Sequence, residues 1–374
     1  MSAADSDARR YHRRQLAVAL ADFGVGVAVL VAWQTTGATH ALAGLLASTF
    51  PARVLIVAGM VLAVGGTIAL LTFPLDILGG FWLPRRAGLL VQSFGGWLGD
   101  RAKALALGGG LTLVAAELVY GLLAWSPDRW WLLSAAILAA GAVLFTLVLP
   151  VWVVPLFYRL TPLQDDGLRV RLLTLAARVG VPAAEVSVAA LSRKGRAANA
   201  AVVGLGRTRR ILVADTLLGS FPPDEVEVVL AHELAHHARG HVTQGLIVQS
   251  LLLGALLWGA DRILSVLARP AALAGPADPA GVPLLGLILT ALGLVATPIL
   301  SAWSRRLERE ADGAAIEVTR APAAFVAAME RLGALNLAER RPARLKELFC
   351  GTHPSLDERI ARGQAAARRL AEAT

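Results

Sequence analysis

Six long apolar stretches constrain the fold of this chain more than any other feature of its sequence. A membrane-spanning helix needs roughly 20 consecutive, mainly apolar residues. The chain of 374 residues is 56% hydrophobic and only 17% charged. Its apolar stretches cover residues 16–33, 54–73, 104–125, 130–158, 242–268 and 282–303. We therefore predict a polytopic α-helical membrane protein with two polar blocks, residues 159–241 and 304–374.

These boundaries predict four consecutive segments. Residues 1–158 would form four transmembrane helices, 159–241 a first polar segment, 242–303 a transmembrane hairpin, and 304–374 a second polar segment. Within the first polar segment, "EVSVAAL", "AAVVGLG" and "RILVAD" have the composition of short strands, and "PPDEVEVVLAHELAHHARG" opens with proline and acidic residues, as helices do. The sequence thus predicts a small α+β unit beside an otherwise helical membrane domain.

The distribution of basic residues predicts the side of the membrane on which each segment lies. All but four of the 36 Lys and Arg residues fall in segments that share one side if the six stretches cross in order. Arg53, Arg129 and Arg269 lie in the opposite turns, and Arg262 ends the fifth stretch. Because cytoplasmic loops are rich in Lys and Arg, we expect both termini and both polar blocks in the cytoplasm, with the protein in the cell membrane. The basic residues lack interleaved aromatics, so nucleic acid is not an expected partner.

The stretch "LAHELAHHARGH" places four histidines and one glutamate within twelve residues. On a helix His232 and His236 are one turn apart on the same face, and Glu233 is displaced by about a quarter turn. Two such histidines can bind a zinc ion while the glutamate acts as a base on a water molecule. His237 and His241 lie on another face, and we interpret them as polar residues at the end of the helix.

A third metal ligand is predicted in "SRRLEREADGAA". Glu308 and Asp312 are four residues apart on one helical face, at the cytoplasmic end of the last apolar stretch. The chain crosses the membrane twice between His236 and Glu308, so both return to the same side. The alternative at this point is that the two acidic residues only pair with neighbouring arginines.

The order of motifs resembles a family of membrane zinc metallopeptidases, which includes the type I CAAX prenyl endopeptidases and the HtpX heat-shock proteases. The motifs are "GGWLGDRAKAL", "PLFYRLTPL", "KGRAANAAVVGL", "RILVADTLL", "HELAHHARGH", "SRRLEREAD" and "THPSLDERI". Four apolar stretches before the histidines favour the CAAX endopeptidase branch. The resemblance implies an all-α polytopic fold of six or seven transmembrane helices with a cytoplasmic, gluzincin-like α+β catalytic domain.

The resemblance also implies a role for each matching residue. One Zn²⁺ per chain would bind His232, His236 and Glu308, with Glu233 as the catalytic base and Asp312 orienting a ligand histidine. Three further positions match residues around the reacting peptide. They are His353 near the developing oxyanion, Arg359 near the ligand glutamate, and Asn199 on an edge strand that would bind an extended substrate by strand addition.

We therefore expect a membrane zinc metalloendopeptidase that hydrolyses peptide bonds of peptides or membrane proteins, with the bilayer as its other partner. Three alternatives stay open from the sequence. An HtpX-like protease would clear damaged membrane proteins, whereas a metal transporter would use similar ligands without chemistry. A non-catalytic scaffold would retain zinc only. The apolar stretches contain no histidine, which argues against transport.

Overall fold

Six helices are long and apolar enough to cross a membrane, counted over residues 3–181, 185–204 and 206–372, which the computed structural model describes. The prediction of six spans is confirmed. The first span is α1 (Ala3–Thr35). The second joins α3 (Arg53–Asp76), the π-helix η1 (Ile77–Trp82) and α4 (Leu83–Arg86), and the fourth joins α6 (Trp130–Val148), η2 (Leu149–Val153) and α7 (Val154–Phe157). The others are α5 (Phe94–Trp125), α11 (His241–Leu267) and α12 (Val282–Thr319).

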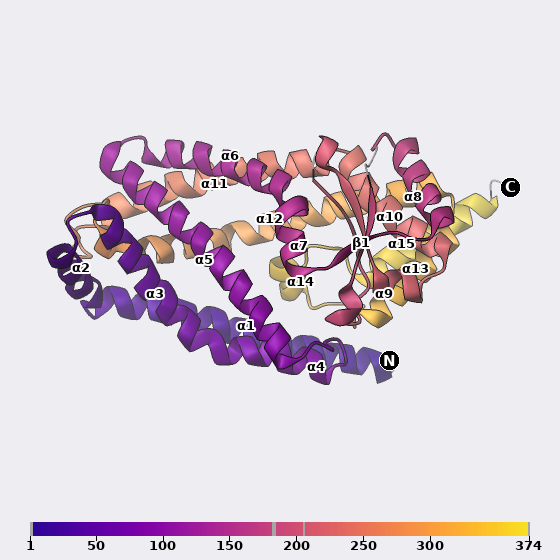
Figure 1. Cartoon of the computed structure of the whole chain (residues 1–374), viewed down its shortest axis with the longest axis horizontal. Helices are drawn as coiled ribbons and strands as arrows, with labels where there is room; N and C mark the ends of the chain where they lie inside the picture. The colour runs from indigo at the N-terminus through magenta and orange to yellow at the C-terminus, as the bar shows by residue number, and fades with distance from the viewer. Residues whose placement is uncertain (1–2, 182–184, 205, 373–374) are drawn as a thin grey trace.

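One further apolar segment does not add a seventh span. Helix α2 (Ala38–Thr49) has 12 residues, which at 1.5 Å per residue is about 18 Å, whereas the hydrocarbon core of a bilayer is about 30 Å thick. It packs on α3 and on the short 3₁₀ helix η5 (Pro279–Gly281). Helix α2 therefore caps the end of the helices that lies far from the sheet (Figure 1).

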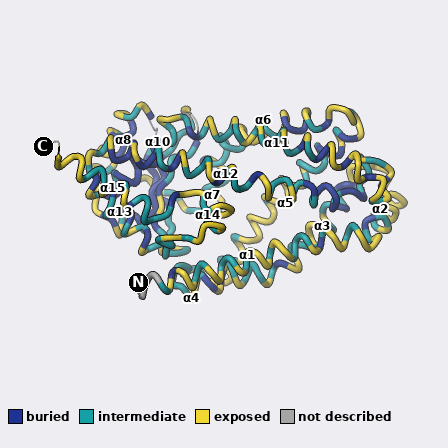
Figure 2. Tube along the Cα trace, turned by 180° about the vertical axis from the view of Figure 1, so that it is seen from behind, coloured by how far each residue is buried: buried dark blue, intermediate teal, exposed yellow. Residues whose placement is uncertain are grey.

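The six spans form a closed ring. Each span packs against the next in the order α1, α3, α5, α6, α11 and α12, and α12 returns to pack against α1. Many large apolar side chains on these helices are exposed, among them Leu70, Leu251 and Val295. Figure 2 shows that exposed residues recur along α1 and α3, whereas buried residues concentrate at the end that holds α8 and α10. Apolar exposure on this scale is expected where helices face lipid.

A four-stranded sheet lies at one end of the molecule (Figure 1). Its strands are β1 (Leu160–Pro162), β2 (Val186–Ala189), β3 (Ala200–Val203) and β4 (Arg210–Ala214), in the spatial order β1-β2-β4-β3. Strands β2 and β4 are parallel and the other pairs are antiparallel. The three predicted strands are confirmed. Strand β1 is not predicted, because three residues are too few to reveal an alternating pattern.

Helices cover this sheet and enclose the largest apolar core. They are α8 (Asp166–Arg178), α9 (Asp215–Ser220), α10 (Pro223–Ala238), α13 (Pro322–Leu335), α14 (Arg344–Cys350) and α15 (Leu356–Glu372), with the short 3₁₀ turns η3 (Leu191–Arg193) and η4 (Gly206–Thr208) between strands. Helix α10 packs against α8, α12, α13 and β3. Its buried residues Val228, Leu230 and Leu234 belong to the core. Burial on nearly all sides fixes α10, and with it the histidines that it carries.

Helix α12 connects the membrane domain to the sheet end. It runs without interruption from Val282 to Thr319 and packs along α10 for its last part. Its final residues Ala311, Ala314 and Ala315 are buried, and such small side chains let two helices approach closely. The helix ends at Arg320, which has a left-handed backbone conformation (φ 51°). The long helix thereby carries Glu308 from the last span to the histidines.

Candidate metal centre and active site

Helix α10 carries His232, Glu233 and His236 in its last two turns. Pro222 precedes the first helical residue, and Asp224 and Glu225 lie in the first turn, where acidic side chains favour helix formation. His232 is buried and His236 is half-buried. Their Nε2 atoms are 3.4 Å apart, so both imidazoles converge on one point, as the helical spacing predicts.

Glu308 of α12 completes a group of three possible metal ligands. Its Oε2 atom lies 3.2 Å from Nε2 of His232, and its Oε1 atom lies 3.4 Å from Nε2 of His236. Ligands held tetrahedrally at about 2.0–2.1 Å from a zinc ion lie roughly 3.3 Å from each other. The three donors therefore fit one face of a zinc coordination sphere, and a zinc ion held by them would have a fourth position for a water molecule or substrate.

Asp312 lies behind His232, one helical turn beyond Glu308. Its carboxylate is fully buried, and Oδ1 lies 2.9 Å from Nδ1 of His232. Arg359 of α15 binds Asp312 with two nitrogens, Nη2 at 2.6 Å and Nε at 2.9 Å. The resemblance implies a position of Arg359 near the ligand glutamate; in the structure Arg359 bonds Asp312, and its Nη2 also lies 3.4 Å from Nδ1 of the ligand His232. Asp312 fixes the proton on Nδ1 of His232 and leaves Nε2 for a metal.

His241 contributes to the site in a way that the helical interpretation missed. The expectation that it faces away from His236 is wrong, because α10 ends at Ala238 and Gly240 adopts a left-handed conformation (φ 69°) that reverses the chain. His241 begins α11, and its Nδ1 lies 3.1 Å from Nδ1 of His236. Its Nε2 lies 3.4 Å from Oε2 of Glu310. The glycine was the available signal, since Gly often follows the last residue of a helix.

Glu233 and His353 lie beside the three ligands. Burial raises the pKa of the Glu233 carboxyl above its ordinary value. His353, which precedes α15, is exposed, and its Nδ1 lies 2.7 Å from Oε2 of Glu308. His237 points elsewhere, because its Nε2 donates a hydrogen bond to the carbonyl of Val202 at 2.9 Å, and burial lowers the pKa of its imidazole. The structure thus brings Glu233 and His353, but not His237, to the ligand group.

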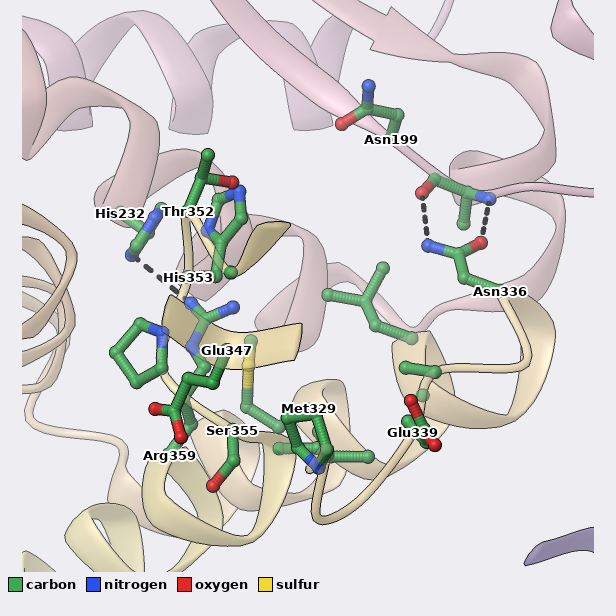
Figure 3. Close-up of a pocket in the computed structure, with 18 of the residues that line it drawn as sticks. Asn199, His232, Met329, Asn336, Glu339, Glu347, Thr352, His353, Ser355 and Arg359 are labelled. Carbon is green, nitrogen blue, oxygen red and sulfur yellow. Dashed lines mark hydrogen bonds between the residues drawn. The ribbon is translucent and has the colours of Figure 1, made fainter. Parts of the chain in front are cut away.

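Two cavities share Glu233 as a lining residue. The first, of about 450 Å³, is lined by residues that include Asn199, His232, His353 and Arg359, several of which Figure 3 shows around one opening. The second, of about 330 Å³, is lined by the first residues of α11 and by Trp303 and Leu307 of α12, together with His236 and Glu308. Asn199 is exposed and directly precedes β3. Strand β3 is an edge strand, as the sequence predicts.

Three features together define an integral membrane metallopeptidase. They are the ring of spans, the helix with two histidines and a glutamate, and the third, acidic ligand. The chain belongs to peptidase family M48, because residues 162–367, more than half of its length, match that family. Residues 3–159 match the CAAX prenyl protease N-terminal region, which is described as five membrane helices. The resemblance drawn from the sequence motifs is confirmed.

Two relatives support this assignment. The chain is 28% identical over 314 residues to the uncharacterized metalloprotease YhfN of Bacillus subtilis (strain 168), across 83% of this chain and 74% of that protein. It is 31% identical over 171 residues to CAAX prenyl protease 1 of Saccharomyces cerevisiae, across 45% of this chain and 37% of that protein. The N-terminal match and these relatives favour the CAAX protease branch, so the HtpX alternative is not favoured.

The fold matches a solved structure over nearly its whole length. The crystal structure of S. mikatae Ste24p superposes with a TM-score of 0.84 and covers 96% of this chain and 89% of that one, at 23% sequence identity. At this identity the likeness shows the fold. The family shows the activity class, a metalloprotease of the membrane, and the transporter and scaffold alternatives find no support in these relatives.

Proposed function

We propose that the protein is a zinc endopeptidase that cleaves extended peptide segments of membrane-associated proteins at the cytoplasmic face of the cell membrane. The observation that supports this most directly is the spacing of His232, His236 and Glu308, whose donor atoms lie 3.2–3.4 Å apart beside the half-buried Glu233. One zinc ion bound there would act as a Lewis acid that lowers the pKa of a water molecule and polarises the scissile carbonyl.

Glu233 acts as the general base. It follows a ligand histidine directly in the chain and lines both cavities. We propose that its carboxylate accepts the proton of the attacking water and later delivers it to the leaving amine. Asp312 and Arg359 hold His232 in the orientation that directs Nε2 to the metal.

His353 stabilises the negative charge that develops on the carbonyl oxygen. The Glu308 carboxylate can only accept hydrogen bonds, so Nδ1 of His353 carries the proton that is shared with it. When Nε2 is also protonated, the exposed imidazolium donates to an oxyanion in the first cavity.

The substrate that we propose is a peptide segment in extended conformation. Asn199 directly precedes the edge strand β3 and lines the first cavity. A peptide can add to such an edge through main-chain hydrogen bonds. The yeast relative is named a CAAX prenyl protease, so a peptide that ends in a prenylated cysteine motif is one substrate to compare with an unmodified peptide of the same sequence.

The distribution of basic residues supports a cytoplasmic location of the site. We propose that residues 159–241 and 304–374 form one catalytic unit on that side, that residues 1–158 supply four spans, and that residues 242–303 form the hairpin that unites the ligands. This division is supported by the packing of α10 against α12.

The experiment compares membranes from cells that express wild-type protein, Glu233→Gln, or the control Arg309→Ala, because Arg309 of α12 pairs with Glu358. Proteomics should find proteins that accumulate uncut only with Glu233→Gln. Purified wild-type enzyme loaded with zinc should cleave those proteins, with loss of cleavage after chelation and recovery with Zn²⁺. If Glu233→Gln cleaves them as fast as wild type, the proposed catalytic role is wrong.

A further inference from the structure

The outer edge of β3 is where a peptide would pair with the sheet. In an antiparallel ladder, the backbone N–H and C=O groups of successive residues alternate between the two sides of a strand. The N–H of Ala214 donates to the carbonyl of Asn199 at 2.9 Å, so Asn199 directs its backbone groups toward β4. By this alternation Ala198, Ala200 and Val202 direct theirs toward the outer edge.

The side chain of Asn336 covers this edge at Ala198. Its Oδ1 accepts a hydrogen bond from the Ala198 N–H at 3.0 Å, and its Nδ2 donates to the Ala198 carbonyl at 3.2 Å. Figure 3 shows both hydrogen bonds side by side, on the wall of the cavity that also holds Asn199 and His353. One side-chain amide thus makes the pairing that a residue of a neighbouring strand would make.

Contacts from its own helix α13 and from the distant α1 hold Asn336 and the next residue in place. It follows the last residue of α13, and its N–H donates to the carbonyl of Leu332 at 2.9 Å. The next residue, Leu337, has φ 49°, a conformation that costs a non-glycine residue free energy and persists where its surroundings impose it. Nε2 of His12, at the start of α1, lies 2.8 Å from the carbonyl of Leu337.

The edge is also covered at its other end. The carbonyl of Val202 accepts the hydrogen bond of His237. Among residues 3–181, 185–204 and 206–372, Ala200 has no hydrogen-bond partner on the outer edge. It lines the same cavity as His232 and Glu233. Ala200 therefore stays open for pairing, between Ala198, whose N–H and C=O are both bonded, and Val202, whose carbonyl is bonded.

We propose that Asn336 determines specificity by ending the substrate-binding edge at Ala198, so that a bound peptide pairs with β3 only around Ala200. This rests on the proposed function. Antiparallel pairing is the more stable and more frequent arrangement, and it directs the carboxyl end of the peptide toward Ala198. Asn336 thereby limits how many residues on the carboxyl side of the cleaved bond are bound in extended conformation.

The proposal predicts how binding depends on peptide length. In the wild-type enzyme, extra residues on the carboxyl side meet Asn336 and gain no pairing, so KM should change by less than about 2-fold when two alanines are added there. In Asn336→Ala, the N–H and C=O of Ala198 become free, and two new backbone hydrogen bonds should lower KM at least about 5-fold for the extended peptide. The value of kcat should change little.

The test uses two sets of peptides with one apolar central sequence, extended by alanines at the carboxyl end or at the amino end. Full-length enzyme in detergent micelles, loaded with zinc, is compared with Asn336→Ala, Asn336→Asp and the control Glu339→Gln. Glu339 lines the same cavity but pairs with Lys346 and not with β3. Asn336→Asp keeps the acceptor for the Ala198 N–H and loses the donor, so its response to length should be intermediate.

Binding of the same peptides, labelled with a fluorophore, is measured in parallel on Glu233→Gln backgrounds, where no hydrolysis is needed. A failure of the proposed function would abolish cleavage by wild type, whereas the length dependence of binding would still report on Asn336. A gain confined to carboxyl-end extension in Asn336→Ala supports the proposal. The same length dependence as wild type, a gain at the amino end, or an equal loss for all lengths would overturn it.

Discussion

Nδ1 of His241, the first residue of α11, lies 3.1 Å from Nδ1 of His236, near the end of α10. When Nε2 of His236 binds a metal, its Nδ1 carries a proton and can donate it to His241. The Nε2–H of His241 then faces the Glu310 carboxylate at 3.4 Å. His236 therefore has an orienting partner of its own, as His232 has Asp312. The turn at Gly240 creates this arrangement.

We predict that His241→Ala lowers the affinity for zinc by about 10- to 100-fold, as the loss of an orienting hydrogen bond behind a ligand histidine typically does. Competition titration with a chromophoric chelator measures this directly. Arg309→Ala is the matched control, because Arg309 is on α12 near the site but pairs with Glu358. Equal affinities of His241→Ala and wild type would mean that the contact does not orient His236.

The membrane fold could be predicted because apolar length is a direct physical requirement of a span. Each predicted stretch agrees with a helix of the structure to within a few residues at one end or both, but several helices extend further at the other end. Helix α1 begins at Ala3, and α12 continues to Thr319, since polar residues such as Arg306 and Glu310 extend a helix into water as readily as apolar ones. The closed ring of spans depends on contacts between distant helices, which no local pattern encodes.

The candidate site was predictable where one helix or one motif carries it. His232, Glu233 and His236 share α10, and Glu308 with Asp312 share α12, so their spacing reveals common faces. Asn336 and His241 were not predicted. Asn336 meets Ala198 across 138 residues of sequence, and His241 meets His236 only because the helix ends between them. Both depend on chain reversals at Leu337 and Gly240 rather than on periodicity.

The division between ligands and base predicts different effects for two adjacent residues. Glu233→Gln should keep zinc and lower kcat by about 100-fold or more, because the isosteric amide cannot accept the proton. His232→Ala should lose both zinc and activity. Metal analysis beside a peptide-cleavage assay tests this pair of variants. Loss of zinc in Glu233→Gln equal to that in His232→Ala would make Glu233 a structural residue.

The topology predicts where reporter fusions are active. The loop between α11 and α12 carries few basic residues, whereas the segments that precede α11 and follow α12 carry many. A fusion after Pro276 should report the outside, and a fusion at Thr374 the cytoplasm. A reporter signal for an external C-terminus would contradict the proposed location of the site.

Three acidic residues of α12 should differ in their effect on zinc, although each lies within one turn of the next. Glu308 supplies a donor atom, so Glu308→Ala should abolish zinc retention. Asp312 bonds His232 directly, and Asp312→Asn should weaken affinity by about 10- to 100-fold. Glu310 lies on the opposite face of the helix from Glu308, and its contact with the site is through His241.

Glu310→Ala should therefore weaken zinc binding by less than about 10-fold, and by less than His241→Ala does, because its effect passes through one more contact, the 3.4 Å approach of its carboxylate to His241. Zinc titration of the three purified variants gives the order. The double variant His241→Ala/Glu310→Ala should bind zinc no more weakly than His241→Ala alone, because without His241 the Glu310 carboxylate no longer has a residue that links it to His236. If the two losses instead add in full, Glu310 acts on the metal by another route, and the chain of contacts from Glu310 to His236 is not what orients the ligand.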